Sequence, residues 1–264
     1  MKLPESFKSY PNITNINELI MFLDKNERSN FYAQFFELNF NISDDGFNAI
    51  AEAMEMQYLQ YGDKNFCQFG EIHLENELHY DGISANSRYT VPDYLLFKVD
   101  LRHKVNGGRF RLLNSVSAIN NLSLEMLSIL KEHDLEFYGF PTFHNPIPIK
   151  DELTFSIKCI QKIGDKLSLR MHIPSEDLSM VVVEKDFIHC KIDDFRIRFA
   201  GMNGVETDKI LCQLRKAIYT DKNLLQFDFN EKLLVVVNNN YVFHGRESTE
   251  VPDRRLMKRY QLKR

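Results

Sequence analysis

The sequence lacks the features that mark several common protein classes. Its four cysteines, at positions 67, 159, 190 and 212, are scattered and form no Cys-x-x-Cys pair, so four reduced thiols are the expected state. The longest uninterrupted apolar run is LLVVV at 233–237, whereas a membrane helix needs roughly 20 such residues. The opening MKLPESFKSYPNITN contains no apolar stretch typical of a signal peptide. We therefore expect a cytoplasmic protein with no membrane partner.

The sequence also lacks a long block of lysine and arginine. Its formal net charge is −4, so a nucleic-acid partner is not expected. Apolar residues are plentiful, because 44% of the chain is hydrophobic and 21 residues are phenylalanine, which is enough for a large core. No linker, repeat or low-complexity tract divides the chain. We therefore expect one domain over residues 1–264, and the sequence leaves the oligomeric state open.

Short strand patterns dominate the chain, with a few helical patterns between them. Apolar spacing and polar caps predict helices at 15–25, after residues 43–45, at 117–133 and at 206–219. Strands are predicted at 31–42, 68–75, 77–82, 92–101 and 110–115, in several runs between 136 and 201, at 233–237 and at 254–262. This pattern predicts a mainly β fold with added helices (α+β), arranged as a β-sandwich or jelly roll.

The motif LHYDG at 78–82 contains the first candidates for chemistry. His79 and Asp81 are two residues apart, and on a strand such side chains point to the same face. His244 lies beyond the apolar strand at 233–237 and could supply a third ligand from another strand. Two histidines and one carboxylate form the facial set that non-haem Fe(II) oxygenases use.

This assignment has alternatives. A His-x-Asp pair is frequent by chance, so these two residues could also form a surface pair. His73 and Glu75 form a competing pair, and the later pair is preferred because Gly82 indicates a strand end at a cavity mouth. The histidines with no partner at a useful spacing are expected at the surface or in the core: His103, His133, His144, His172 and His189.

Arginines follow His244 in the segment RRLMKR. On a strand, Arg255, Met257 and Arg259 share one face, which places two cations on an apolar wall. A buried arginine requires an anionic partner, and its planar fork matches a carboxylate. A dicarboxylate co-substrate could chelate the metal with one end and reach an arginine with the other. The alternative is a basic C-terminal tail in solvent.

Together these segments resemble taurine-dioxygenase-like and clavaminate-synthase-like enzymes, which are Fe(II)- and 2-oxoglutarate-dependent oxygenases on a double-stranded β-helix. The stretch NNNYVFHGRESTEVPDRRLMKRY resembles their closing motif, and LHYDG resembles their His-x-Asp-Gly. Asn239 and the triplet His244-Gly245-Arg246 match the motif, whereas Asn238 stands where Asp is usual. GGRFRLLNSVSAINNLS at 107–123 and the strand-then-helix opening FFELNFNISDDGFNAIAEAM are also similar. Between about 135 and 205 only the strand rhythm matches.

The resemblance implies roles for individual residues. His79, Asp81 and His244 would bind Fe(II), and Arg255 would pair with the distal carboxylate of 2-oxoglutarate. Arg259 matches a position that contacts the co-substrate or the anionic group of the substrate. One departure is Phe110, which stands where the family usually has a threonine that binds the same distal carboxylate. A carboxylate at position 81 argues against halogenation, because halogenating relatives have a small residue there.

The implied function is dioxygenase chemistry with O2 on a small-molecule substrate. Hydroxylation of an unactivated C–H bond is the default outcome, and desaturation or ring closure begins in the same way. An anionic substrate such as an amino acid or its derivative is expected. Glu71, Glu75 and Glu77 could hold an ammonium group or could simply form a solvated face. The alternatives are a catalytically inactive jelly roll that only binds a ligand, and a cupin-like metal enzyme without a co-substrate.

Overall fold

The computed structural model describes residues 3–23, 31–58, 66–68, 71–72, 76–81, 91–102, 108–140, 149–174, 178–191, 194–247 and 253–264. The competing pair His73 and Glu75, together with Gly82, His103 and His144, lies outside these residues. Among the described helices, none is long and apolar enough to cross a membrane. The fold is mainly β with added helices, which confirms that part of the predicted class.

A large antiparallel sheet with one parallel pair forms one side of the molecule. Its strand order is β1 (Phe7–Ile13), β2 (Ala33–Leu38), β17 (Leu233–Asn238), β7 (Tyr94–Arg102), β19 (Asp253–Lys263) and β3 (Gln57–Tyr58). The short strands β4 (Phe66–Gln68) and β5 (Glu71–Ile72) also pair with β19, and β1 runs parallel to β2. The apolar run LLVVV lies in β17, between β2 and β7, where its residues Leu234 to Val237 are buried.

A smaller sheet packs against one face of the large sheet. Its strand order is β16 (Leu225–Phe227), β8 (Phe110–Asn114), β18 (Val242–Arg246) and β6 (Asn76–His79). One cluster of buried side chains joins the two sheets, with Phe35, Phe97 and Val235 from the large sheet and Phe110 and Leu112 from the small one. Alternation along each strand sends these side chains inward, so the two sheets form a sandwich around an apolar core.

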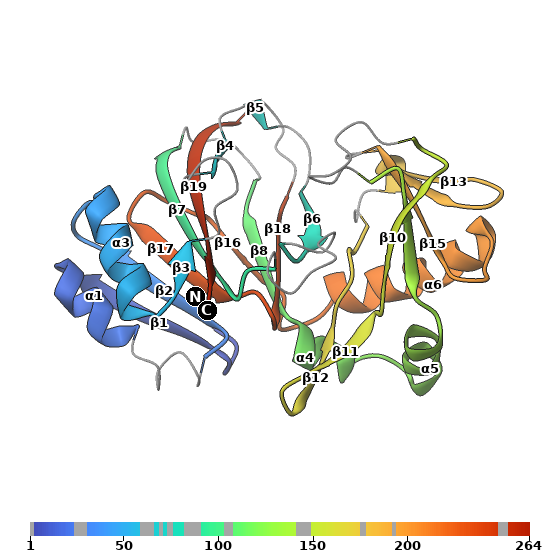
Figure 1. The fold of residues 1–264 in the computed structure, drawn as a ribbon, viewed down its shortest axis with the longest axis horizontal. Coiled ribbons are helices and arrows are strands. Elements are labelled where there is room, and N and C mark those ends of the chain that lie inside the picture. The colour runs from blue at the N-terminus through green and yellow to red at the C-terminus, as the bar shows by residue number, and fades with distance from the viewer. Residues whose placement is uncertain are drawn as a thin grey trace.

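Two helices cover the outer face of the large sheet. They are α1 (Ile16–Phe22) and α3 (Asp44–Ala53), and both lie beside that sheet in Figure 1. The side chains of Asn15 and Ser43 cap their first turns, as expected for the predicted helix starts. A second apolar cluster, which includes Phe47 and Ile50 of α3, fills the space between helices and sheet.

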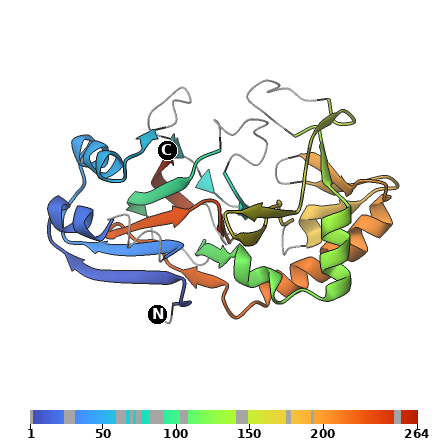
Figure 2. The same ribbon diagram turned by 60° about the horizontal axis from the view of Figure 1, so that its bottom comes forward.

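A second lobe packs on the outer face of the small sheet. It contains a five-stranded sheet in the order β10 (Leu153–Ile157), β9 (Leu135–Tyr138), β15 (Phe195–Phe199), β14 (Ile188–Cys190) and β13 (Val181–Val183), the last preceded by the short 3-10 helix η1 (Leu178–Met180). A hairpin of β11 (Ile160–Ile163) and β12 (Lys166–Leu169) joins it. The helices α4 (Ser115–Ile119), α5 (Leu124–Glu132) and α6 (Gly204–Tyr219) cover one side of this lobe (Figures 1 and 2). The largest apolar cluster binds the lobe to the small sheet through Leu78, Leu113 and Phe243.

Three predictions about the elements need correction. The single helix predicted at 117–133 is two helices, because Ser123 caps a new helix start at α5. No strand was predicted between 233–237 and 254–262, whereas His244 lies in a separate strand there, β18, after a turn at 239–241. The strands β1, β14 and β16 were not predicted. The last two contain only three residues each, which is too short for a clear alternation.

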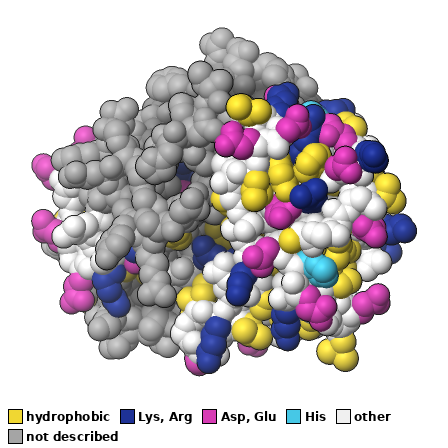
Figure 3. All heavy atoms as spheres, turned by 45° about the vertical axis from the view of Figure 1, so that its right-hand side comes forward, with side chains coloured by type: hydrophobic (Ala, Val, Ile, Leu, Met, Phe, Trp, Pro, Cys, Tyr) yellow, Lys and Arg dark blue, Asp and Glu magenta, His cyan; other side chains and the backbone are white. Residues whose placement is uncertain are grey.

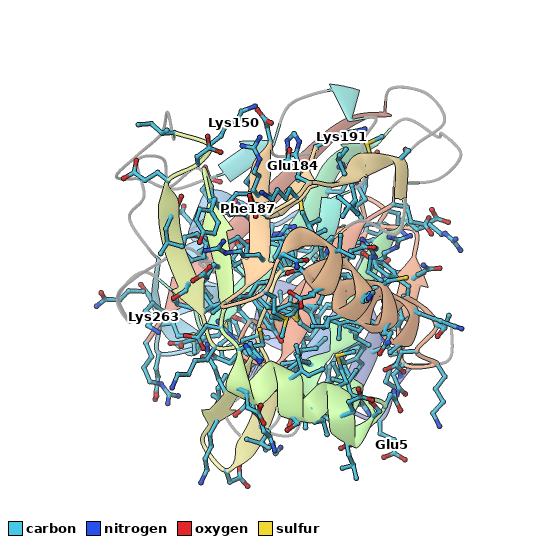
Figure 4. All side chains as sticks on the ribbon, turned by 90° about the vertical axis from the view of Figure 1, so that its right-hand side faces the viewer. Glu5, Lys150, Glu184, Phe187, Lys191 and Lys263 are labelled. Carbon is cyan, nitrogen blue, oxygen red and sulfur yellow. The ribbon has the colours of Figure 1, made fainter. Side chains whose placement is uncertain are left out.

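The outer face of the five-stranded sheet carries a network of ion pairs, called the charged face below. Its members are Glu136, Lys150, Asp151, Glu184, His189, Asp194, Arg196 and Arg198. Figure 4 shows Lys150 and Glu184 at the same end of this lobe, close to Phe187. Figure 3 shows acidic and basic side chains interspersed over the described part of the surface. Arg196 contacts Glu184 at 2.6 Å and Arg198 contacts Glu136 at 2.8 Å, so both arginines have carboxylate partners.

Candidate metal centre

Strand pairing in the small sheet brings the predicted ligands together. His244 in β18 is the direct cross-strand partner of His79 in β6, so the two side chains share one face. Their ring centroids are 4.4 Å apart. Asp81 follows two residues after His79, and one donor atom from each of the three residues lies within 4.8 Å of the other two. The geometric prediction of convergence is confirmed, whereas the role of these residues as ligands stays a prediction.

The three side chains lie largely out of solvent. Asp81 is 5% exposed, His244 is 3% exposed, and the side chain of His79 is 17% exposed. Asp81 Oδ1 is 3.3 Å from His244 Nε2 and 3.7 Å from His79 Nε2. One carboxylate oxygen therefore faces both imidazoles, which is the arrangement a facial three-ligand site requires.

The Asp81 carboxylate is fixed by two side chains of β19. Arg259 Nη1 donates to Oδ1 and Gln261 Nε2 donates to Oδ2, each at 2.7 Å. Arg259 therefore lies beside the predicted ligands, and its partner there is the Asp81 carboxylate. Gln261 was not predicted. It lies two residues after Arg259, so the same alternation that places Arg259 in the site would have identified it.

Asn239 holds the backbone of Asp81. The Asp81 N–H donates to Asn239 Oδ1 at 3.1 Å, and Asn239 Nδ2 donates to the Asp81 carbonyl at 3.0 Å. The same Nδ2 donates to the Pro92 carbonyl at 3.0 Å. Asn239 is fully buried, and it was matched to the family motif without a role. In the structure, the Asn239 side-chain amide ties the turn between β17 and β18 to the backbone of Asp81.

The environment sets the charge states that metal binding requires. Burial raises the pKa of the Asp81 carboxyl, but Arg259 and interactions with His244 and His79 outweigh burial and hold this pKa well below its usual range. Burial and the neighbouring His79 lower the pKa of His244 to about 4. Near neutral pH the site therefore presents an ionised carboxylate and a neutral imidazole, the states in which these groups bind a metal.

The chemistry of the donor set fits Fe(II). Both ring nitrogens of His244 are buried without a hydrogen-bond partner in the described part of the chain, and the contact of Nε2 with Asp81 lacks hydrogen-bond geometry. Buried polar atoms are normally satisfied, so a buried imidazole without partners is unfavourable unless a ligand completes it. A metal ion bound by His79, Asp81 and His244 would complete the Nε2 atom, which faces Asp81, with three positions left for other ligands.

Two further residues, His172 and Phe110, lie near the centre. His172, expected at the surface or in the core, is 4% exposed, and its ring lies 6.1 Å from that of His79 because the neighbouring residue Ile173 forms a bridge with Leu78. Phe110 packs in the core against Phe97, so no hydroxyl stands at that position.

Arg255, the predicted partner of 2-oxoglutarate, lies in β19 opposite Arg102 of β7. The structure describes its backbone and not its side chain, so its role stays a prediction. The side chains of Glu71 and Glu77, and the whole of Glu75, also lie outside the described part.

The sequence matches one protein family over most of its length. Residues 35–261 match the family described as taurine catabolism dioxygenase TauD, TfdA family. The chain belongs to this family. The assignment confirms the dioxygenase class and the dependence on iron and 2-oxoglutarate that the resemblance implied, with a small-molecule substrate and O2 as the reactants. No curated protein of similar sequence is found.

Solved structures confirm the fold at low sequence identity. PvcB from Pseudomonas aeruginosa superimposes with a TM-score of 0.67 at 13% identity, covering 92% of this chain and 79% of that one. Another structure of PvcB, described as an Fe, alpha-ketoglutarate-dependent oxygenase from an isonitrile synthetic pathway, gives a TM-score of 0.68 at 12% identity and covers 98% and 91%. A taurine dioxygenase from Burkholderia xenovorans gives 0.61 at 11% identity, covering 93% and 80%.

Proposed function

We propose that this chain oxidises an unactivated C–H bond of a small anionic substrate, with Fe(II) held by His79, Asp81 and His244 and with 2-oxoglutarate as co-substrate. The observation that carries the proposal is the buried His244 imidazole, whose two nitrogens lack hydrogen-bond partners among the described residues and which faces an ionised carboxylate. Hydroxylation is the proposed outcome, and desaturation would begin from the same arrangement.

The proposal assigns a task to each described side chain of the centre. When bound, Fe(II) and 2-oxoglutarate supply the activation of O2 and the oxidising power. His79, Asp81 and His244 would hold the metal between the small sheet and the large one, because His244 packs against Phe97 of β7 and Asp81 pairs with residues of β19. Gln261 and Arg259 keep the Asp81 carboxylate in a fixed plane, so that Oδ1 remains directed at the histidines.

Apolar side chains form part of the surroundings of the centre. The ring of Phe97 lies 5.2 Å from that of His244, and Phe110 and Leu112 continue the apolar wall between the sheets. A site with such walls strengthens the electrostatic interactions inside it. The two β-sheets that form these walls are proposed to be the double-stranded β-helix, or jelly roll, of one domain that spans residues 1–264.

An amino acid or amino-acid-derived metabolite is the proposed substrate class. Arg259 supports an anionic substrate, because it places a cationic guanidinium beside the three proposed ligands. Arg255 is proposed to pair with the distal carboxylate of 2-oxoglutarate. The cytoplasm is the proposed compartment, which the free thiols of Cys159, Cys190 and Cys212 support.

The test is iron-dependent conversion of 2-oxoglutarate to succinate in the presence of individual amino acids. We expect succinate formation that requires Fe(II) and rises with an anionic amino acid or derivative. Arg255→Ala should raise the KM for 2-oxoglutarate. Product formation without 2-oxoglutarate, unaffected by Arg255→Ala, would instead support a cupin-like metal enzyme. Absence of iron-dependent turnover with every substrate would support the inactive ligand-binding jelly roll.

A further inference from the structure

The turn between β17 and β18 is held from the second lobe. Three consecutive backbone carbonyls of this turn accept hydrogen bonds from side chains outside it. The donors are Arg170 Nη1 for Asn239 at 3.3 Å, Ser168 Oγ for Asn240 at 3.0 Å and Ser115 Oγ for Tyr241 at 3.1 Å. The two serine hydroxyls also contact each other at 2.7 Å. The turn that contains Asn239 is therefore held by Ser168 of β12 and the following Arg170, and by Ser115 at the start of α4.

Arg170 is an unusual member of this set because it is a buried cation. It is 9% exposed, and burial lowers the pKa of its guanidinium. No carboxylate in the described part of the chain forms an ion pair with it. Its contacts there are the Asn239 carbonyl and the face of Tyr80, whose ring centroid lies 4.3 Å from the Arg170 Cζ atom. On the charged face, by contrast, Arg198 stacks on Tyr138 at 5.0 Å and also pairs with Glu136.

A buried arginine with so few partners does not serve stability. Removing a charge from water is costly, and one hydrogen bond to a neutral carbonyl with one ring contact offsets only part of that cost. An apolar side chain of similar length would pack in the same place without the desolvation cost. The residue is therefore expected to contribute to something other than the free energy of folding.

Both contacts of Arg170 connect it to Asp81, one through Tyr80 and the other through Asn239. Tyr80 lies between His79 and Asp81 in sequence, its ring packs against Phe243, and its hydroxyl donates to the Leu169 carbonyl at 2.6 Å. Asn239, the other contact, binds both backbone polar groups of Asp81. Arg170 thus joins the segment 79–81, which contains two of the proposed ligands, to the turn that clamps one of them.

We propose that Arg170 is a positioning residue for the Asp81 carboxylate, holding Tyr80 and the Asn239 turn so that the carboxylate stays directed at His79 and His244. This inference rests on the proposed function of the three ligands. Residues that orient metal ligands typically change metal affinity by about 10- to 100-fold when they are replaced. The expected signature is a loss of metal affinity without a loss of stability.

The test compares Arg170→Met with the matched control Arg198→Met, which removes another arginine stacked on a tyrosine in the same lobe. Anaerobic Co(II) titration measures metal affinity, and thermal unfolding of the metal-free protein measures stability. Arg170→Met should bind Co(II) about tenfold or more weakly, with an unfolding midpoint at or above that of the wild type. Arg198→Met should lower the midpoint and leave the Co(II) affinity unchanged. Arg170→Lys keeps a donor for the Asn239 carbonyl and should recover part of the affinity.

The outcomes separate this inference from the proposed function. If the wild type binds Co(II) and Asp81→Ala does not, the metal site is established. Unchanged Co(II) affinity in Arg170→Met would then overturn only the role of Arg170. A variant Arg170→Met that fails to fold, or that unfolds at a lower temperature than the wild type, also overturns it, because either result assigns the residue to stability. A wild type that does not bind Co(II) overturns the proposed function as well.

Discussion

The metal centre and the charged face are two clusters of charged side chains that are built in opposite ways. On the charged face, Arg196 and Arg198 are paired with carboxylates at 2.6 and 2.8 Å, and their side chains remain 18% and 31% exposed. At the centre, His244 has two buried nitrogens without hydrogen bonds in the described chain, and behind the centre Arg170 is buried without a carboxylate there.

We infer from this difference that the charged face serves stability and that the candidate metal centre serves chemistry. A satisfied, half-exposed network gains modest Coulomb energy and needs no further partner. A buried set with unsatisfied atoms is unfavourable in the folded state and persists where a ligand completes it. Substitutions should therefore affect metal binding at the centre and stability on the charged face. The predictions below test this division from the largest expected effect to the smallest.

Asp81→Ala should have the largest effect. It removes one of three ligands and leaves Arg259 beside an apolar side chain, so we expect Co(II) affinity to fall by about 100-fold or more. The matched control is Asp194→Ala, which removes a carboxylate that contacts Lys150 at 2.6 Å on the charged face. Isothermal titration with Co(II) measures both variants. Equal affinities for Asp81→Ala and the wild type would refute the assignment of the centre.

Arg259→Leu should shift the pH range of metal binding. Burial raises the Asp81 pKa and Arg259 opposes burial, so removal of the cation raises this pKa. The carboxyl must be ionised to bind a metal, and protons compete only when the pH falls toward its pKa. In the wild type this competition begins in strong acid. In Arg259→Leu we expect the midpoint of metal loss at a higher pH, measured by Co(II) titration between pH 8 and 4. Superimposable curves would contradict the electrostatic account.

Arg196→Ala should affect stability alone. The Arg196 side chain is 18% exposed and that of Glu184 is 30% exposed, so solvent screening reduces the value of their pair. We expect the free energy of unfolding to fall by about 1 kcal/mol, measured by urea denaturation, with Co(II) affinity unchanged. Weaker metal binding in this variant would mean that the two clusters are coupled.

The last prediction concerns the reactivity of the cysteine thiols and requires no substitution. Burial raises the pKa of Cys159 to about 12, and Cys190 is fully buried, whereas Cys212 is exposed. A maleimide should label Cys212 in the folded protein and should reach Cys159 and Cys190 only after unfolding. Mass spectrometry of the labelled peptides gives the answer. Rapid labelling of Cys159 in the native protein would show that the lobe core opens readily.

Sequence patterns predicted that His79, Asp81 and His244 converge, but not which residues surround them. His79 and Asp81 are only two residues apart, so local spacing was sufficient to predict their proximity, although the strand predicted at 77–82 ends at His79 and Asp81 follows it. The pairing of His244 with His79 could be proposed but not placed, because the register of two distant strands depends on the whole sheet. The strand β18 and the turn that separates it from β17 were not predicted.

The residues that surround the centre could not be predicted either, because their contacts also depend on the packing of segments far apart in the sequence. Nothing near Arg170 in the sequence indicates that it will meet Tyr80 and Asn239, since three elements from two parts of the fold must first pack together. His172 was expected at the surface or in the core, because no histidine or carboxylate lies at a useful spacing from it in the sequence. Its place beside His79 follows from the bridge between Leu78 and Ile173, a contact between segments far apart in the chain.

The most direct test of the account is an anaerobic titration of Fe(II) followed by 2-oxoglutarate, monitored in the visible range. The wild type should develop the weak charge-transfer band of 2-oxoglutarate chelated to Fe(II). His244→Ala should abolish this band, whereas His189→Ala, which removes a histidine of the charged face, should leave it intact. A wild type without the band at saturating Fe(II) and 2-oxoglutarate, or a band that survives His244→Ala, would contradict the assignment of the metal centre.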